Sequence, residues 1–134
     1  GFSISEKGHH KHGEYLIRNA ALPGFWPEEI DLLAQVVRFH RGKVPHHAKH
    51  EAFRALAPWH RQVVRKLAAI LRASDALDRR RRQSVRHLAV EVDEQRLHLI
   101  LDAAGDVDPE MEAFLDKGAL LGTLLDRWIE VTVV

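Results

Sequence analysis

The segment WHRQVVRKLAAILRASDALD, residues 59–78, is the longest part of the chain with apolar residues at helical spacing, so the expected architecture is built around it. A helix that is apolar around much of its circumference is typical of one buried among other elements. We therefore expect a long central helix opened by Pro58, since proline is tolerated at the first helical position. The apolar positions on which this rests are Val63, Val64, Leu67, Ala68, Ile70 and Leu71.

Three further helices are predicted before this stretch. Residues 8–21 form the first, which Pro23-Gly24 ends. The second begins at Pro27 and continues with apolar residues at three- and four-residue spacing until Gly42 stops it. A short helix at residues 51–56 follows a loop rich in His, Lys and Pro. The first part of the chain is thus expected to be a helical bundle.

After the central helix the pattern changes from helical to alternating. Apolar residues alternate with others at residues 88–92 and 97–101, which predicts a hairpin turning at residues 93–95. Asp108-Pro109 then opens a helix through about Leu125, and the β-branched residues 128–134 predict a third strand. The expected fold class is mainly α with a small α+β tail: a helical bundle at residues 1–82, then a β-β-α-β unit at residues 83–134.

Composition excludes several classes of function. The 134 residues include no cysteine, which removes disulfides, thiolate metal sites and cysteine nucleophiles. No apolar run is long enough for a membrane span and no signal peptide is evident, so we expect a cytoplasmic protein without a membrane partner. The net charge of +1 gives no strong overall field, so attraction for a polyanion must come from local clusters. The opening GFSIS lacks a start signal, which suggests a chain cut from something longer.

One such cluster is the run Arg79, Arg80, Arg81 and Arg82, with Arg72 nearby. Guanidinium groups can fork onto phosphate oxygens, so the run is a candidate polyanion site. The alternative is that these arginines are only a solvated surface, whose positive charges interact favourably with the negative carboxyl-terminal end of the central helix. His9, His10 and His12 are candidates for a metal or for ordinary helix-end residues, since residues one turn apart on a helix are neighbours.

His40 and Asp75 are each expected to face the core, because each continues an apolar stripe of its helix. A buried imidazole needs a partner, so one interpretation is a His40–Asp75 hydrogen bond that fixes helix packing. The other is a pair of metal ligands. No catalytic residue is predicted, because the chain has no GxSxG, no glycine-rich phosphate loop and no convincing Ser/His/Asp set. Phe25, Trp26, Phe39 and Trp59 lie on or beside apolar helix faces, so we expect core packing and no nucleic-acid partner.

Three stretches taken together resemble one family: GHHKHGEYLIRNAALPGF (residues 8–25), VVRFHRGKVP (residues 36–45) and LAAILRASDALDRRR (residues 67–81). They are similar to the C-terminal region of the Ppx/GppA phosphatases, the exopolyphosphatases and guanosine pentaphosphate phosphohydrolases. The similarity runs in order from residue 1 to about residue 82, and the β-β-α-β tail matches that family's ending in outline.

The resemblance implies an HD-like helical bundle belonging to a homodimeric enzyme. The amino-terminal actin-like phosphatase domains of the same parent chain would hold the catalytic carboxylates, the phosphate loops and Mg²⁺. His40 and Asp75 would match two ligands of the HD pattern, whose His-Asp pair would fall just before Gly1, so the metal site is partial or vestigial. Arg18 and the histidines His9, His10 and His12 would match a stretch whose role is packing and lining a phosphate path. Gly13 departs from the serine common in that stretch.

The function expected on this basis is that of an accessory domain, inactive alone, which helps bind polyphosphate or guanosine pentaphosphate while the absent domains hydrolyse its terminal phosphate. No cofactor is certain within this chain. Two alternatives stay open: a dimerisation or docking module without a ligand, and a metal-dependent HD-type phosphohydrolase. The sequence does not separate inorganic polyphosphate from guanosine pentaphosphate as the substrate.

Overall fold

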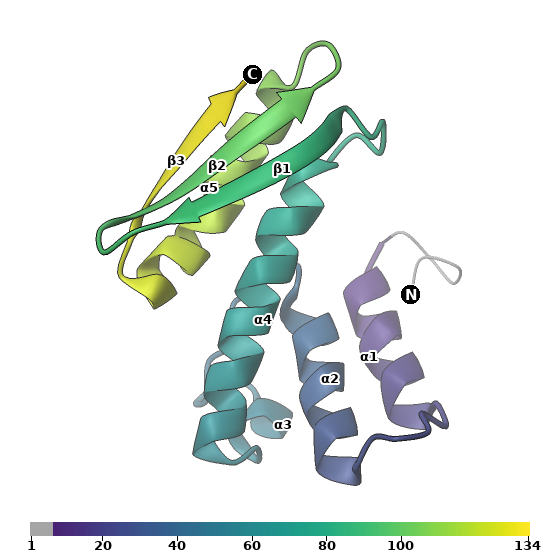
Figure 1. Ribbon diagram of the computed structural model, residues 1–134. Helices are drawn as coiled ribbons and strands as arrows, with labels where there is room; N and C mark the ends of the chain where they lie inside the picture. Colours follow the sequence, from purple (N-terminus) through teal and green to yellow (C-terminus); the bar gives the residue numbers. More distant parts are fainter. Residues whose placement is uncertain (1–6) are drawn as a thin grey trace. The chain divides into compact units, whose positions relative to one another are not determined.

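The computed structural model describes residues 7–134 and shows a helical part followed by a three-stranded sheet with one further helix (Figure 1). The elements are α1 (His9–Asn19), α2 (Pro27–Phe39), α3 (Glu51–Arg54), α4 (Pro58–Leu77), β1 (Val85–Val92), β2 (Arg96–Ala103), α5 (Asp108–Leu125) and β3 (Trp128–Val133). The predicted class, mainly α with a small α+β tail, is confirmed. No helix within the described part of the chain is long and apolar enough to cross a membrane.

The chain divides into two compact units, Gly1–Ala68 and Ala69–Val134, so that the division falls inside α4. The sequence-based boundary after residue 82 follows the change from helix to strand. The boundary between the compact units falls earlier in the chain, because the second half of α4 contributes to the core beneath the sheet.

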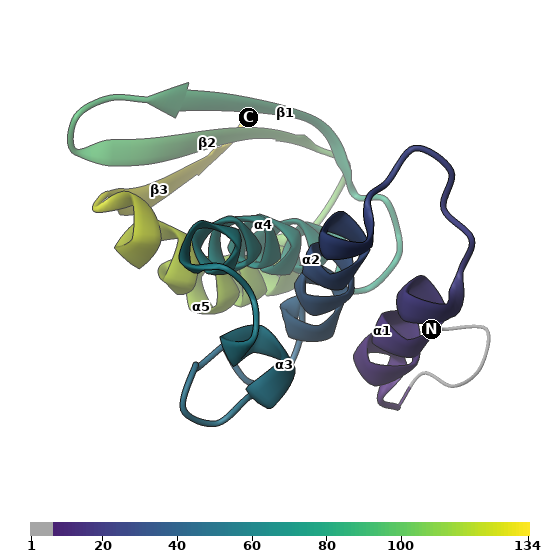
Figure 2. The ribbon, with the colours of Figure 1, turned by 90° about the horizontal axis from the view of Figure 1, so that it is seen from below.

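In the first unit, α1 and α2 lie side by side (Figures 1 and 2). Their close approach depends on Gly13, where an added Cβ would lie 2.6 Å from Cγ1 of Val37. That requirement gives a physical reason for glycine at this position. The core of the unit joins α2, α3 and the first half of α4 through Leu32, Val36, Phe39, Phe53, Val64 and Ala68.

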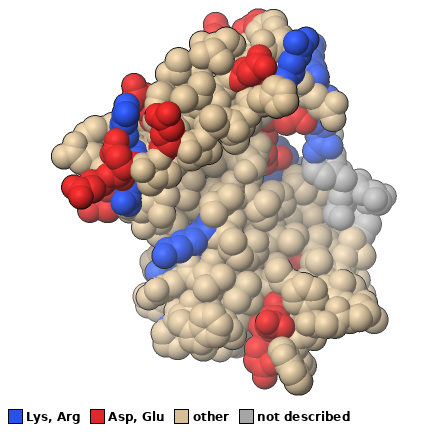
Figure 3. Space-filling model, viewed as in Figure 1, with Lys and Arg blue, Asp and Glu red and all other residues tan. Residues whose placement is uncertain are grey.

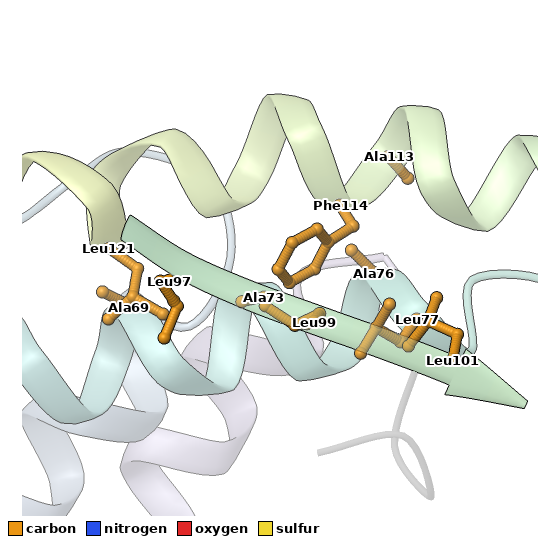
Figure 4. Close-up of a cluster of buried hydrophobic side chains, with 10 residues drawn as sticks. All are labelled: Ala69, Ala73, Ala76, Leu77, Leu97, Leu99, Leu101, Ala113, Phe114 and Leu121. Carbon is orange, nitrogen blue, oxygen red and sulfur yellow. The ribbon is translucent and has the colours of Figure 1, made fainter. Parts of the chain in front are cut away.

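In the second unit, β2 is the central strand, antiparallel to β1 and parallel to β3. Helix α5 connects β2 to β3 and lies on the same face of the sheet as the second half of α4 (Figure 2). Alternate residues of β2 point into this core, which Figure 4 shows with Phe114 of α5 between the leucines of β2 and the alanines of α4. The predicted hairpin and β-β-α-β order are therefore confirmed.

Two expectations about burial are wrong. Helix α4 is not buried around its circumference, because Leu67, Ile70 and Leu71 are 39%, 47% and 42% exposed, and its small residues form the buried side. The aromatic residues also divide: Phe39 is buried, whereas the three others expected in the core are exposed. These are Phe25, Trp26 and Trp59. Both tryptophans stand at helix starts, Trp26 as the residue before α2 and Trp59 in the first turn of α4, so they project from the ends of packed faces.

Candidate functional site

A cavity of about 510 Å³ opens in the first unit and is lined almost entirely by basic side chains. The first turn of α1, the last turn of α2 and the segment between α2 and α3 all contribute to it. Its lining has five Lys or Arg residues, two histidines and no Asp or Glu. The lining residues are His10, Lys11, Arg38, Phe39, Arg41, Gly42, Lys43, Lys49 and His50.

Local sequence explains why these residues converge. Gly8 has a left-handed φ of 76° and precedes α1, and the first turn of that helix carries no acidic residue. The positive end of α1 therefore adds to the charge of Lys11. Gly42, with φ of 75°, turns the chain after α2. A Cβ at Gly42 would lie 3.7 Å from Nε2 of His10, so the turn brings its backbone against the cavity wall.

Most of these cations have no counter-charge. Among residues 7–134, carboxylates form no ion pair with Lys11, Arg41, Lys43 or Lys49. Arg38 differs, because its Nε lies 3.2 Å from Oε2 of Glu14. Like charges gathered around a concave surface raise the local concentration of anions. The cavity is therefore suited to an anion with several negative groups.

The positive charges around the cavity also affect the pKa of His10. Burial, together with the charges of Arg38, His9, His40 and Lys11, lowers the pKa of His10 from 6.5 to about 4. Its Nδ1 is buried and has no hydrogen-bond partner among the described residues. The imidazole is therefore neutral near pH 7. A negative ligand in the cavity would favour its protonated form and raise its pKa.

His9 and His40 hold α1 against the end of α2 beside this cavity. Their Nε2 atoms are 3.1 Å apart, and Nδ1 of His40 lies 2.5 Å from the carbonyl oxygen of Val37. With Nδ1–H of His40 donating to that carbonyl, its Nε2 can accept from Nε2–H of His9, so a neutral pair satisfies the geometry. His9 is 5% exposed.

The predicted metal ligands have partners within their own units. Asp75 Oδ2 lies 3.3 Å from Nζ of Lys117, whereas His40 contacts His9 as described above. Within the described residues, no group of three or more His, Asp or Glu side chains is placed to hold a metal ion. The His40–Asp75 pairing and the partial HD site stay predictions. His12, another predicted ligand, has a buried Nδ1 without a hydrogen-bond partner in the described chain.

The predicted polyanion-binding arginines lie in different environments. Arg80 forms an ion pair with buried Glu110, and Arg18 forms ion pairs with Glu14 and Asp31. Burial lowers the pKa of Arg72, and the negative charge of Asp116 partly offsets this shift. The other three arginines of the run, Arg79, Arg81 and Arg82, are exposed. Of the residues predicted to bind a polyanion, His10 lines the basic cavity.

Sequence reasoning missed most of the cavity, although a signal was present. The chain has no acidic residue between Asp31 and Glu51, while four Lys or Arg residues occur in that interval. A count of charge by segment would have found this interval. The missed lining residues are Lys11, Arg38, Arg41, Lys43, Lys49 and His50.

Comparison with models of known protein families gives a match over most of the chain. The family model described as Ppx/GppA phosphatase, domain III, matches residues 1–123. The match covers both the helical part and most of the β-β-α-β unit.

Proposed function

Since this chain belongs to the Ppx/GppA phosphatase family, we propose that it is an accessory domain that binds the phosphate groups of inorganic polyphosphate or guanosine pentaphosphate. The observation that carries the proposal is the basic cavity of residues 10–50, which has five Lys or Arg side chains and no carboxylate in its lining. Hydrolysis of the terminal phosphate is assigned to actin-like domains elsewhere in the parent chain. Those domains would also hold the Mg²⁺.

The chemistry of the lining favours phosphate over a singly charged anion. Arginine presents several N–H donors in one plane, which matches two oxygens of a phosphate group, and lysine adds a compact charge. Arg38, Arg41 and Lys43 all line the cavity, so a chain of linked phosphates could contact several donors. A volume of about 510 Å³ accommodates part of such a chain.

Binding at this cavity would support catalysis without taking part in the reaction. Contacts to parts of a substrate remote from the reacting bond supply binding energy that positions the bond to be broken. A long polyphosphate reaches a remote cavity, whereas a short one does not. Among inorganic polyphosphates, the contribution of the cavity is therefore expected to be larger for long chains than for short ones.

The direct test is a calorimetric titration of the chain with medium-length inorganic polyphosphate at low salt. The test variant carries Lys11→Gln, Arg41→Gln and Lys43→Gln. The matched control carries Arg79→Gln, Arg82→Gln and Arg86→Gln, which remove the same charge from exposed residues outside the cavity. We expect the cavity variant to bind about tenfold or more weakly, and the control to bind close to the unaltered chain.

Two outcomes would contradict the proposal. Equal losses in both variants would mean that only overall charge matters. A larger loss in the control would move the binding site to the arginine run. Turnover is tested separately, by incubating the chain with polyphosphate and Mg²⁺ or Mn²⁺ and measuring released phosphate. No release is expected, and sustained release would show a catalytic site within this chain.

A further inference from the structure

The part of the first unit around α3 and the start of α4 is basic beyond the cavity. Residues 32–68 include eight Lys or Arg residues and one acidic residue, Glu51. In the part of the chain that the structure describes, no carboxylate forms an ion pair with the four cations of this region that lie outside the cavity lining. These four are Arg54, Arg61, Arg65 and Lys66. Their charge is therefore available to an anionic ligand.

Exposed aromatic rings stand among these cations. Trp59, in the first turn of α4, is 63% exposed, and its ring centroid lies 3.9 Å from that of His60. Before α3, the exposed rings of His46 and His47 are stacked, with centroids 5.4 Å apart and planes inclined by 6°. Helix α3 separates the two pairs along the chain and lies beside the start of α4 (Figures 1 and 2). Two aromatic pairs thus flank α3.

Hydrogen bonds fix the segments that carry the rings. Nδ1 of His46 accepts from the backbone N–H of Ala48 at 3.2 Å, which holds the imidazole against its own loop. Nη1 of Arg61 donates to the carbonyl oxygens of Arg54 at 3.0 Å and Leu56 at 2.6 Å, which ties α4 to the end of α3. Surfaces held in place before binding lose less conformational entropy when a ligand is bound.

Helix α4 places an aromatic ring and a cation on one exposed face. Trp59 and Lys66 are seven residues apart, which is close to two helical turns or about 10 Å along the axis. The first turn of α4 has no acidic residue, so its positive end is not neutralised. A ligand that alternates planar groups with negative charges would match this face.

We infer that the first unit binds single-stranded nucleic acid at this surface, with bases stacked on Trp59 and on the His46–His47 pair and phosphates near Arg54 and Lys66. Cations alone would serve any polyanion, including polyphosphate. The exposed rings favour nucleic acid, because every base has a face that stacks on an aromatic side chain. A duplex keeps its bases stacked on one another, so the single strand should bind more tightly.

This inference reverses an expectation and does not depend on the proposed function. Core packing of Trp59 was one reason to expect no nucleic-acid partner, and Trp59 is exposed. The rings and cations named for the strand lie outside the lining of the basic cavity. Polyphosphate binding in the cavity can therefore succeed or fail without deciding whether the strand binds at α3 and α4.

Trp26 provides a matched control within the same unit. It is 73% exposed and stands directly before α2, much as Trp59 stands at the start of α4. Its surroundings differ in charge, because Glu28 and Glu29 lie in the first turn of α2. Figure 3 shows acidic side chains gathered over the start of this helix. Phosphates would be repelled there, so Trp26 should not contribute to binding.

Fluorescence anisotropy of labelled single strands of about twelve nucleotides, as RNA and as DNA, tests the inference at low salt. We expect saturable binding of at least one of the two. Trp59→Ala should weaken that binding about tenfold, whereas Trp26→Ala should leave it unchanged. Lys66→Gln should reduce the dependence of the affinity on salt, because one phosphate contact is lost. Circular dichroism checks that each variant folds.

A second ligand separates the bases from the phosphates without altering the protein. An abasic strand with the same number of phosphates should bind the unaltered chain about as weakly as the complete strand binds Trp59→Ala. The affinity for inorganic polyphosphate should be the same for Trp59→Ala and the unaltered chain. Three results would each overturn the inference: no saturable binding of RNA or DNA, equal affinity for the abasic and complete strands, or equal losses in Trp59→Ala and Trp26→Ala.

Discussion

Arg80 binds the carboxylate of Glu110 with both arms of its guanidinium: Nε donates to Oε1 at 3.0 Å, and Nη2 donates to Oε2 at 2.7 Å. The backbone N–H of Arg80 also donates to Oε1 at 3.2 Å. Glu110 is 2% exposed, so the pair joins the turn after α4 to the first turn of α5 at a buried carboxylate. Within a run of four arginines, Arg80 is thus a residue that stabilises the fold.

Replacing Arg80 with alanine should destabilise the chain markedly. The substitution leaves the buried carboxylate of Glu110 without its main donors, and an unsatisfied buried charge is costly. We expect the thermal midpoint Tm to fall by roughly 5–10 °C. Differential scanning calorimetry measures it. Arg79→Ala is the control, because Arg79 is exposed, and it should shift Tm only slightly. Equal shifts for the two variants would mean that the pair with Glu110 contributes little.

The pH dependence of stability should also reflect this pair. Hydrogen bonds from Arg80 hold the pKa of Glu110 below its ordinary value of 4.5. The folded state then binds a proton less readily than the unfolded state, so the stabilisation is complete above pH 4.5 and is lost as the pH falls through the folded pKa. Denaturant unfolding from pH 6 downwards should show a steeper loss for the unaltered chain than for Glu110→Gln. Parallel curves would argue against the assignment.

His10 should give the stability of the chain a second dependence on pH, separate from that of Glu110. Its pKa is lowered from 6.5 to about 4, chiefly by burial, so the folded state resists protonation and stability is lost as the pH falls between these values. His10→Gln should flatten the stability curve in that window, whereas the exposed control His47→Gln should not. NMR titration of the His10 ring should give a midpoint near 4 that rises when polyphosphate is added. A midpoint near 6.5 without ligand would contradict the buried, cationic environment.

The packing of α1 on α2 can be tested at Gly13. Gly13→Ala would place its Cβ against Val37, and such overpacking costs about 1–3 kcal/mol, which exceeds or offsets the gain of about 1 kcal/mol from better helix propensity. The double variant Gly13→Ala with Val37→Ala removes the clash. The double variant should therefore lose less free energy of unfolding than the two single variants lose in total. Additive effects would indicate that the two positions do not interact.

The sequence predicted the order and type of the elements because each rests on a local pattern. Period two at residues 88–101 and helical spacing at residues 59–78 are visible without tertiary information. The buried side of α4 is different. It consists mainly of alanines, while the larger Ile70 and Leu71 remain exposed, so hydrophobic size along the helix did not indicate which side packs.

The candidate site could not be predicted in the same way, because it is formed by contacts between residues distant in the sequence. Arg79 and Arg80 are neighbours of the same type, and only Glu110, thirty residues later, distinguishes them. The basic cavity joins residues of α1 to residues beyond α2, and the turn at Gly42 brings them together. Charge counting finds the cations, but their convergence on one cavity needs the fold.

The most direct test of anion binding is an NMR titration of the chain with inorganic polyphosphate, following the backbone amides. We expect the largest chemical-shift changes at residues 8–11 and 38–50, with saturation at modest salt and little change at residues 79–86. Changes confined to residues 79–86, or no saturable change anywhere, would contradict anion binding in the cavity.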